Sequence, residues 1–360
     1  MLIISLQRRS VNNKRVTSFD VAELAGVSRS TVSFVFSEDK QSRIRPETRQ
    51  RVREAAEKLG YYPNASARAL ASNQSNTIGL IMTRSPRYIA SDNFLPQIIG
   101  GLLDIVKQEQ LGLLIEWVEP GQQIQTYLQL TRAKHIDGMI ILTPRFDDPG
   151  LTALEQIDIP CVLMGQIPEC NLPYVDIDNR ASAKLAVDYL IELGHRQIAC
   201  ITNAATAYSS ASQRLEGYRD ALKAAEIAID DSLIRMADFD AASGYSQMKD
   251  LLVEYPRFSA IFVASDNVAL GALAAIHDAG LSVPEDISLV GFDDIPEAAF
   301  YYPKLTTVHT PAKEIAEESC HLLMQLLKGE IPYSRTINIP TQLIIRDSAR
   351  MIERSHITTN

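Results

Sequence analysis

Two adjacent carboxylates, Asp293 and Asp294, follow the apolar stretch ISLVGF and are the residues with the most direct potential for catalysis. A carboxylate pair can hydrolyse a glycosidic bond when one group is the acid and the other the base or nucleophile. Neighbouring residues at a strand end point in different directions, which argues against their sharing one substrate. The sequence also contains no GxGxxG, Walker, HExxH or GxSxG motif, and His195 falls at an expected helix-to-strand turn, where a structural role is favoured.

The four cysteines do not form a pattern typical of a metal site or a disulfide. They are widely spaced, include no CxxC pair, and mostly lie in apolar segments such as IPCVLMG and IACIT: Cys161, Cys170, Cys200 and Cys320. We expect reduced thiols, no bound metal and no cofactor. Because no apolar run approaches the roughly 18 residues of a membrane span or resembles a signal peptide, we expect a cytoplasmic protein with no membrane partner.

Charge is unevenly distributed along the chain. Residues 1–75 contain 13 Lys and Arg against 7 Asp and Glu, whereas the remaining residues contain 22 against 37. A basic amino-terminal segment therefore precedes an acidic body. This asymmetry indicates that the first segment meets a polyanion, although chance clustering on solvated helices would give the same totals.

The stretch DVAELAGVSRSTVSFVF predicts two short helices separated by Gly26. Ser18 can cap the first helix and Ser28 the second. The second helix then has one apolar face, formed by Val32, Val35 and Phe36. At about 100° per residue, Phe34 lies about 200° from Val32 and should face away from the core.

A third helix should begin at Pro46, which suits a first helical turn, and end at Gly60. From Thr77 onward, apolar runs of strand length alternate with helical segments, a pattern typical of parallel α/β architecture. The expected strands are TIGLIM, LGLLIEWV, DGMIIL, PCVLMG, QIACIT, AIFVAS, ISLVGF and LIIR, and the expected helices include residues 181–193, 212–225, 266–279 and 311–327. This number of strands suits two similar lobes, with a ligand site between them.

The composite of DVAELAGVSRSTVS and ETRQRVREAAEKLGYYPNASARALAS resembles the LacI/GalR family of transcriptional regulators. The segments LGHRQIACIT, RLEGYRDAL, ASDNVALGAL, VPEDISLVGFDD and PKLTTVHTP resemble the effector-binding body of that family. The resemblance extends from Thr17 to Ser348. It implies an α/β protein with a small all-α helix-turn-helix head and a two-lobed body with parallel sheets, like that of periplasmic binding proteins.

The domain organisation follows from this resemblance. We expect a disordered basic extension (1–16), a helix-turn-helix domain (17–62), a hinge helix or linker (63–75), an effector-binding and dimerisation domain (76–348), and a tail (349–360). Within the body, the N-lobe should comprise about 76–175 and 308–337, and the C-lobe about 176–307 and 338–348.

Family members place the second helix of the head in the major groove, usually as dimers on near-palindromic operators. The residues that match DNA-contacting positions of the head are Thr17, Ser28, Arg29, Ser30, Thr31, Ser33, Phe34 and Tyr61. Arg29 can read guanine O6 and N7 bidentately, or it is an exposed or phosphate-bound arginine. Thr17, Ser28 and Tyr61 match phosphate-positioning residues. Phe34 replaces a frequent arginine, so we predict apolar contact with a thymine methyl group.

The segment NASARALASNQ, residues 64–74, is too short to be a stable helix in isolation. In the family the equivalent segment becomes a helix on operator DNA and lies in the minor groove. Asn64, Ala67 and Leu70 match contact positions, and Leu70 matches a leucine that is wedged between base pairs and kinks the duplex.

The resemblance also implies a small effector bound between the lobes. The residues that match effector-binding positions are Phe94, Tyr208, Arg214, Phe239, Ser265, Asp266 and Asp293. Arg214 and Asp293 would bind polar groups of the ligand, and Phe94 and Phe239 would stack on a sugar ring. Asp266 could instead cap its helix. Tyr208 stands where an arginine serves purine-type ligands, which favours a carbohydrate.

We therefore expect a homodimeric, sequence-specific transcriptional regulator, a repressor, with operator DNA and a carbohydrate effector as partners. The residues after LIIRDSA are mostly polar and contain no leucine heptad, so we expect a dimer and not a tetramer. A periplasmic sugar-binding protein would share the body, but it would need a signal peptide and no basic head. A carbohydrate-active enzyme is the less favoured alternative.

Overall fold

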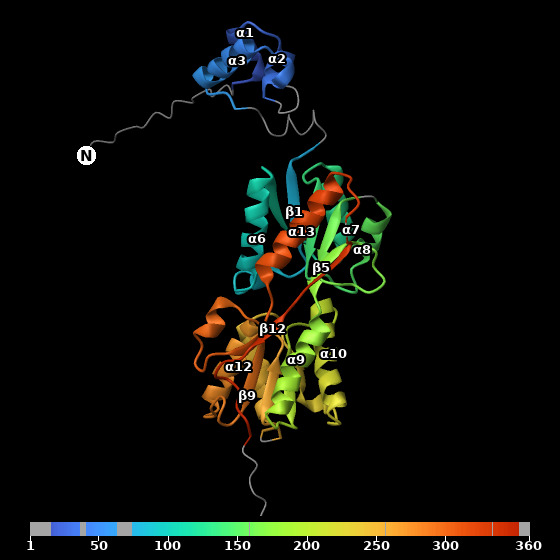
Figure 1. Cartoon of the computed structure of the whole chain (residues 1–360), viewed down its shortest axis with the longest axis vertical. Coiled ribbons are helices and arrows are strands. Elements are labelled where there is room, and N and C mark those ends of the chain that lie inside the picture. The colour runs from blue at the N-terminus through green and yellow to red at the C-terminus, as the bar shows by residue number, and fades with distance from the viewer. Residues whose placement is uncertain are drawn as a thin grey trace, which may run out of the picture. The chain divides into compact units, whose positions relative to one another are not determined.

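The computed structural model describes residues 16–36, 41–62, 74–157, 159–255, 257–332 and 334–352 (Figure 1). The chain divides into two compact units, residues 1–75 and residues 76–360. None of the helices in the described ranges combines the length and the apolarity that crossing a membrane requires.

In its described residues, the first unit, here called the head, contains three α-helices around a small apolar core. These are α1 (Ser18–Ala25), α2 (Arg29–Val35) and α3 (Pro46–Leu59), with a short 3-10 helix at Gln41–Arg43. Valines from all three helices are almost completely buried together with four alanines: Val21, Val32, Val35, Val52, Ala22, Ala25, Ala55 and Ala56. Small side chains let these short helices approach closely.

The helix ends in the head follow the expected chemistry with one exception. Ser28 caps α2 by accepting a hydrogen bond from the Thr31 N–H (3.1 Å), and Gly26 ends α1 in the left-handed conformation. The prediction that Ser18 caps α1 is wrong, because Thr17 does so. The Thr17 N–H donates to the Asp20 carboxylate (2.7 Å), and the Thr17 hydroxyl accepts from the backbone, which makes a reciprocal capping box.

The second unit, the body, contains two lobes built on separate six-stranded sheets. The N-lobe sheet is parallel throughout and has the order β11-β5-β4-β3-β1-β2. Its strands are β1 (Thr77–Met82), β2 (Gly112–Trp117), β3 (Gly138–Leu142), β4 (Cys161–Met164), β5 (Tyr174–Ile177) and β11 (Thr336–Ile339).

Helices cover both faces of the N-lobe sheet, as Figure 1 shows. On one face α6 (Leu95–Gln108) packs against α13 (Ala312–Leu327), and on the other lie α7 (Gln123–Arg132) and α8 (Pro149–Gln156). The central strands β1, β3 and β4 are almost entirely buried because both faces of the sheet are covered, whereas the edge strands β2 and β11 are partly exposed. A short helix, α5 (Pro86–Ile89), follows β1.

The C-lobe repeats this plan with the order β12-β10-β9-β8-β6-β7. Its strands are β6 (Ile198–Thr202), β7 (Ile234–Met236), β8 (Ala260–Val263), β9 (Ser288–Asp293), β10 (Thr306–His309) and β12 (Gln342–Ile344). Among the strands in the described residues of this lobe, β12 alone is antiparallel to its neighbour. The helices α9 (Asn179–Glu192) and α10 (Ser209–Ala224) cover one face, and α11 (Ala241–Leu252) and α12 (Asp266–Asp278) cover the other. Two 3-10 helices lie at Asp231–Leu233 and Pro296–Ala299.

The chain passes between the lobes three times. It leaves the N-lobe after β5, returns after β10, and leaves again after β11. The strands before these passages end at Ile177, His309 and Ile339, in each case two residues later than the boundary expected from the sequence. Each lobe is therefore assembled from segments far apart in the chain.

Candidate functional site

The exposed face of α2 is the candidate DNA-reading surface of the head. Four of the matched residues are exposed, namely Ser28, Arg29, Ser30 and Ser33, whereas Thr31 and Phe34 are half-buried. Thr31 is held by a hydrogen bond between its hydroxyl and that of Ser28 (2.9 Å). The α2 N-terminus therefore presents a guanidinium and several hydroxyl groups, which can contact phosphates and base edges.

The two phenylalanines of this segment lie in different surroundings. Phe36 packs against the head core and against Tyr61, with ring centroids 6.0 Å apart. The core cluster of the described residues does not include Phe34, as the helical phase predicts. Tyr61 is only half exposed and Thr17 is exposed. The hinge residues Asn64, Ala67 and Leu70 lie outside the described residues.

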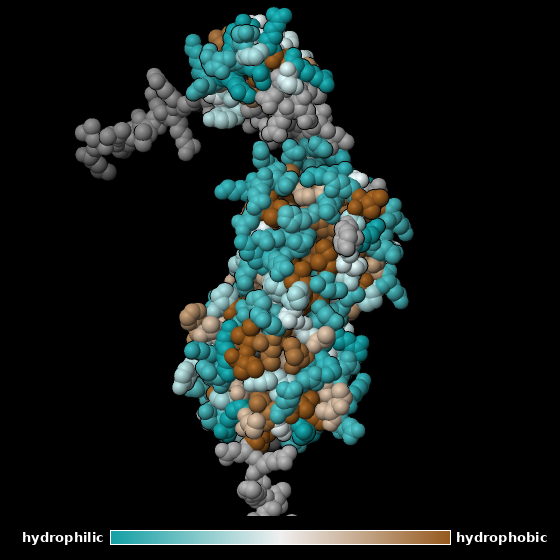
Figure 2. Space-filling view, viewed as in Figure 1, coloured by the Kyte–Doolittle hydropathy of each residue, from teal (hydrophilic) through white to brown (hydrophobic). Residues whose placement is uncertain are grey.

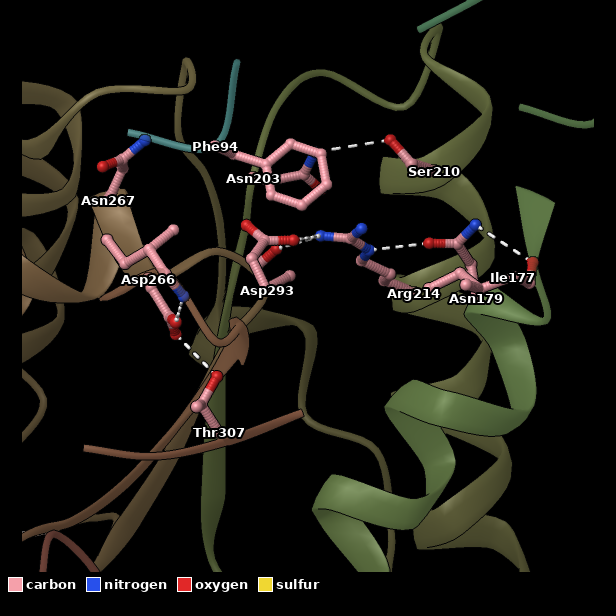
Figure 3. A network of polar contacts seen from close by, with 12 residues as sticks. Phe94, Ile177, Asn179, Asn203, Ser210, Arg214, Asp266, Asn267, Asp293 and Thr307 are labelled. Atoms are coloured by element: carbon pink, nitrogen blue, oxygen red, sulfur yellow. Dashed lines mark hydrogen bonds and ion pairs between the residues drawn. The ribbon is translucent and has the colours of Figure 1, made fainter. Parts of the chain in front are cut away.

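In the body, the centre of the candidate site is a buried pair between α10 and the end of β9. Arg214 Nη1 donates to Asp293 Oδ1 (3.2 Å) and to the carbonyl oxygen of Ala264 (2.8 Å), while Nε donates to Asn179 Oδ1 (2.9 Å) (Figure 3). The guanidinium lies 3.7 Å from the ring centroid of Phe292. Both charged side chains are less than a tenth exposed, so the pair is fixed and largely desolvated.

Asp293 is held in an unusual state. Burial raises the pKa of its carboxyl group to about 6, while the charge of Arg214 and a hydrogen bond from Ser265 oppose that shift. Its φ is +112°, a backbone conformation that side chains other than glycine rarely adopt. Backbone strain of this kind often occurs at binding sites.

The hydrogen-bond network continues from Arg214 towards the N-lobe. Asn179, at the start of α9, donates through Nδ2 to Asp176 Oδ1 on β5 (3.0 Å). Burial raises the pKa of Asp176 to about 6. The chain Asp293–Arg214–Asn179–Asp176 thus links the candidate site to the first passage between the lobes.

Aromatic rings from the C-lobe meet arginines from the N-lobe. Tyr208 and Phe239 make an edge-to-face contact with centroids 5.0 Å apart, and both are buried. The guanidinium of Arg84 lies 4.6 Å from the Phe239 centroid, and that of Arg145 lies 4.6 Å from the Tyr208 centroid. The arginines therefore cover faces on which a sugar could stack.

A second buried ion pair lies on the N-lobe side. Arg84 Nη1 contacts Asp92 Oδ2 (2.6 Å), and Asp92 Oδ1 accepts from the backbone at the start of α6 and from Asn267 Nδ2 of the C-lobe (3.3 Å). Phe94, which precedes α6, is half-buried and packs against apolar clusters of both lobes. The sequence pattern did not identify Arg84, Asn179 or Asn267, although Asn267 lies within the quoted ASDNVALGAL segment.

Asp266 is separate from the Arg214 pair. It is completely buried, and it accepts hydrogen bonds from the Ile295 N–H (3.1 Å) and the Thr307 hydroxyl (2.7 Å), pointing away from Asp293 in Figure 3. Burial and the nearby Asp293 raise its pKa well above the usual range. The alternative that Asp266 caps its helix is wrong, because Ser265 occupies the N-cap position of α12.

The side chains considered for catalysis have structural partners. Asp294 contacts Arg346 (2.7 Å) and His309 (2.9 Å), so the adjacent carboxylates Asp293 and Asp294 have different neighbours. The buried His195 ring lies 2.9 Å from the Ser259 hydroxyl, and burial lowers its pKa. All four cysteines are free thiols, and no cluster of potential metal ligands occurs within the described residues.

Comparison with protein families gives two matches along the chain. Residues 19–64 match the model described as bacterial regulatory proteins, lacI family. Residues 187–349 match the model of a periplasmic binding protein-like domain. The first match covers most of the head, and the second covers most of the C-lobe and the last segments of the body.

Relatives match nearly the whole chain. The HTH-type transcriptional regulator CelR of Thermobifida fusca is 33% identical over 338 residues, which is 93% of this chain and 98% of that protein. The HTH-type transcriptional repressor CytR of Escherichia coli K12 is 36% identical over 341 residues, covering 93% and 97% of the two chains.

Solved structures agree with these matches. A lac repressor dimer bound to operator and the anti-inducer ONPF has a TM-score of 0.81 at 31% identity, covering 94% of this chain and 100% of that one. A CelR complex with cellobiose has a TM-score of 0.71 at 32% identity, covering 93% and 100%.

Proposed function

Because the chain belongs to the lacI family of bacterial regulatory proteins, we propose that it is a homodimeric repressor whose affinity for a near-palindromic operator is controlled by a neutral carbohydrate. Its relatives are transcriptional regulators and repressors. The observation that carries the ligand part is the buried Arg214–Asp293 pair, and the Tyr208–Phe239 ring pair of the same lobe supplies candidate stacking surfaces. Its place of action is the cytoplasm, where operator DNA lies.

The proposed DNA contacts of the head divide into two kinds. Arg29, Ser30, Thr31, Ser33 and Phe34 would meet base edges or phosphates from the outer side of α2. The exposure of Arg29, Ser30 and Ser33 supports this role, while Thr31 and Phe34 are half-buried. Thr17, Ser28 and Tyr61 would position phosphates. The linker residues Asn64, Ala67 and Leu70 would enter the minor groove, with Leu70 kinking the duplex.

A neutral sugar suits the charge balance of the candidate ligand site. Arg84 is paired with Asp92 and Arg214 with Asp293, so the two buried arginines are already neutralised. Carboxylates accept hydrogen bonds from hydroxyl groups, and the half-buried Phe94 ring offers apolar surface. The face of Phe239 would become available to a sugar when Arg84 leaves it. The solved CelR complex contains cellobiose. Because the present protein is similar to CelR, this supports a carbohydrate as its ligand as well.

A homodimer is supported by apolar side chains on the body surface. Figure 2 shows apolar patches on the visible face of the body between hydrophilic regions. Large exposed apolar residues include Leu103 on α6, Leu270 on α12, and Phe300 and Tyr302 after the Pro296–Ala299 helix. Such exposure is typical of surfaces that meet a partner.

We propose that ligand binding changes the relative orientation of the lobes and thereby biases the linker between coil and helix. The Asp293–Arg214–Asn179–Asp176 chain connects the ligand site to the first passage between the lobes. Contacts that the ligand makes in one orientation of the lobes but not in the other would make it bind the first orientation more tightly.

The test is a DNA-binding assay with the purified full-length protein. Operator candidates are selected from random DNA, and their dissociation constants are measured at several salt concentrations with and without a panel of sugars. We expect a steep salt dependence and a change in operator affinity with one sugar class. Binding of DNA without sequence preference, or no response to any sugar, would contradict the respective part of the proposal.

A further inference from the structure

Asn203, directly after β6, has a buried amide with an incomplete set of hydrogen bonds. The residue is 4% exposed, and its Oδ1 has no hydrogen-bond partner among the described residues. Its Nδ2 makes only a long contact with the Ser210 hydroxyl (3.4 Å). A buried polar atom without a hydrogen-bond partner is destabilising, so the Oδ1 atom of Asn203 indicates that a bound molecule supplies the missing hydrogen bond.

The strand register places Asn203 in a row with two other candidate ligand residues. Ile201 of β6 is paired with Val263 of β8, and two residues further along Asn203 is level with Ser265. Continued three residues beyond its last pair, Phe262 with Val290, the register between β8 and β9 brings Ser265 level with Asp293. Figure 3 shows Asn203 on the same side of the site as Phe94 and Asp293.

This row lies where ligands bind in parallel α/β proteins, at the carboxyl ends of adjacent strands. Neighbouring strands are about 4.8 Å apart, so the Cα atoms of Asn203 and Asp293 are separated by roughly 10 Å. The two side chains would therefore contact different carbons of a sugar ring.

The backbone of Asn203 is held independently of its side chain. Its carbonyl oxygen accepts a hydrogen bond from the Phe239 N–H (2.7 Å), which also fixes Phe239 in its left-handed conformation. The amide is thus presented from a fixed point beside the Tyr208–Phe239 ring pair. The unpartnered Oδ1 atom therefore plays no part in holding Asn203 in position.

We infer that the Asn203 side-chain amide hydrogen-bonds a hydroxyl group of the ligand and helps select neutral carbohydrates over anionic ones; this inference rests on the proposed function. Exchanging the amide oxygen and nitrogen would leave the NH2 end facing the site instead. A hydroxyl group satisfies either end, because it both donates and accepts. A carboxylate or phosphate can only accept, and it would meet the carboxylate of Asp293.

The experiment compares the full-length wild type with Asn203→Ala, Asn203→Leu and the control Asn171→Ala. Asn171 is exposed in the loop before β5. Dissociation constants are measured calorimetrically for glucose, galactose, ribose and cellobiose, for glucuronate and glucose 6-phosphate, and for cytidine and adenosine. The alanine variant leaves a cavity, whereas leucine keeps most of the volume but removes the polar atoms.

Both Asn203 variants should bind the preferred neutral sugar about 10- to 100-fold more weakly, and the control should match the wild type. One monodeoxy derivative of that sugar should lose a similar factor on the wild type but little on Asn203→Ala. This non-additivity identifies the hydroxyl group, and a purely structural role would not produce it. Operator binding without sugar should be unchanged.

Wild-type affinity of both Asn203 variants for every sugar would overturn this inference and leave the proposed function intact. The same holds if all monodeoxy derivatives lose equal factors on wild type and variant. Preference of the wild type for glucuronate or glucose 6-phosphate would overturn the selection of neutral sugars. If the wild type binds no neutral sugar, both this inference and the carbohydrate part of the proposed function fail.

Discussion

In the head, most candidate contacts follow one another along α2 and are exposed, whereas in the body they come from distant segments and are buried. The Arg29 side chain is in solvent, while Arg214 is 7% exposed and has three hydrogen-bond acceptors. Because the candidate DNA contacts of the head lie at its surface, they should contribute little to the folding stability of the head. In the body, Arg214 and Asp293 would bind ligand and also stabilise the lobe through their mutual contact, so substituting either one should change both properties.

Removing the central arginine of the body should have the largest effect. Arg214→Leu leaves Asp293 buried without its partner and should destabilise the body by about 3–5 kcal/mol. Urea unfolding followed by the fluorescence of Trp117, the only tryptophan, reports on the body directly. Arg29→Leu is the control from the head, and it should change this transition by less than about 0.5 kcal/mol. If Arg214→Leu and Arg29→Leu changed the free energy of unfolding equally, the proposed difference between the buried body contacts and the exposed head contacts would be wrong.

The pH dependence of body stability should come partly from Asp293. Its folded pKa of about 6 lies above the unfolded value of about 3.9, so the folded state binds the proton more tightly. Stability should therefore rise as pH falls from 7 towards 5, by about 1–2 kcal/mol from this group. Asp293→Asn should remove that part of the slope, and the remaining slope should include Asp176, whose pKa is also raised. A variant with the wild-type slope would show that Asp293 does not titrate in this range.

Loss of the α1 cap should have a moderate and local effect. Thr17→Ala removes the capping box and should cost about 1 kcal/mol, which is roughly a five-fold loss of amide protection in α1 by hydrogen exchange. Ser18→Ala is the matched control and should have little effect, because Ser18 is not the cap. The body amides should keep their protection in both variants. The reverse order of the two effects would refute the assignment of the cap.

Phe34 should have the smallest effect on stability and the clearest effect on base preference. Phe34→Arg should change the unfolding free energy by less than about 0.5 kcal/mol, whereas Phe36→Ala should cost more because Phe36 packs on the head core. Selection from randomised operators should show that the wild type prefers A·T at one position and that the variant does not. An unchanged preference at every position would leave Phe34 without a reading role.

The sequence predicted strands best where the apolar character of a segment was sufficient to identify it as a strand. All eight predicted strands occur. Six of them are buried along almost their whole length, whereas β2 and β12 are partly exposed. The four strands that were missed are only three or four residues long, and most contain polar residues: β5 (YVDI), β7 (IRM), β10 (TTVH) and β11 (TINI). Their identity depends on pairing with neighbours, which a local pattern does not contain.

The same limit applies to the candidate site. The structure brings Arg214 and Asp293 together, but it directs Asp266 towards Thr307. Arg84 and Asn203 lie in segments with no distinctive motif. Their importance arises from what the fold places beside them: a phenylalanine ring from the other lobe for Arg84, and a missing hydrogen-bond partner for Asn203.

The three passages between the lobes have a consequence for synthesis on the ribosome. The last strand of the N-lobe, β11, and the last strand of the C-lobe, β12, lie within residues 336–344, at an edge of their respective sheets. The N-lobe also needs α13, which is made after most of the C-lobe. The head helices are complete by Leu59, so a nascent chain can form the head long before either lobe has its last strand. A chain terminated before residue 336 would have a complete head but two incomplete sheets in its body.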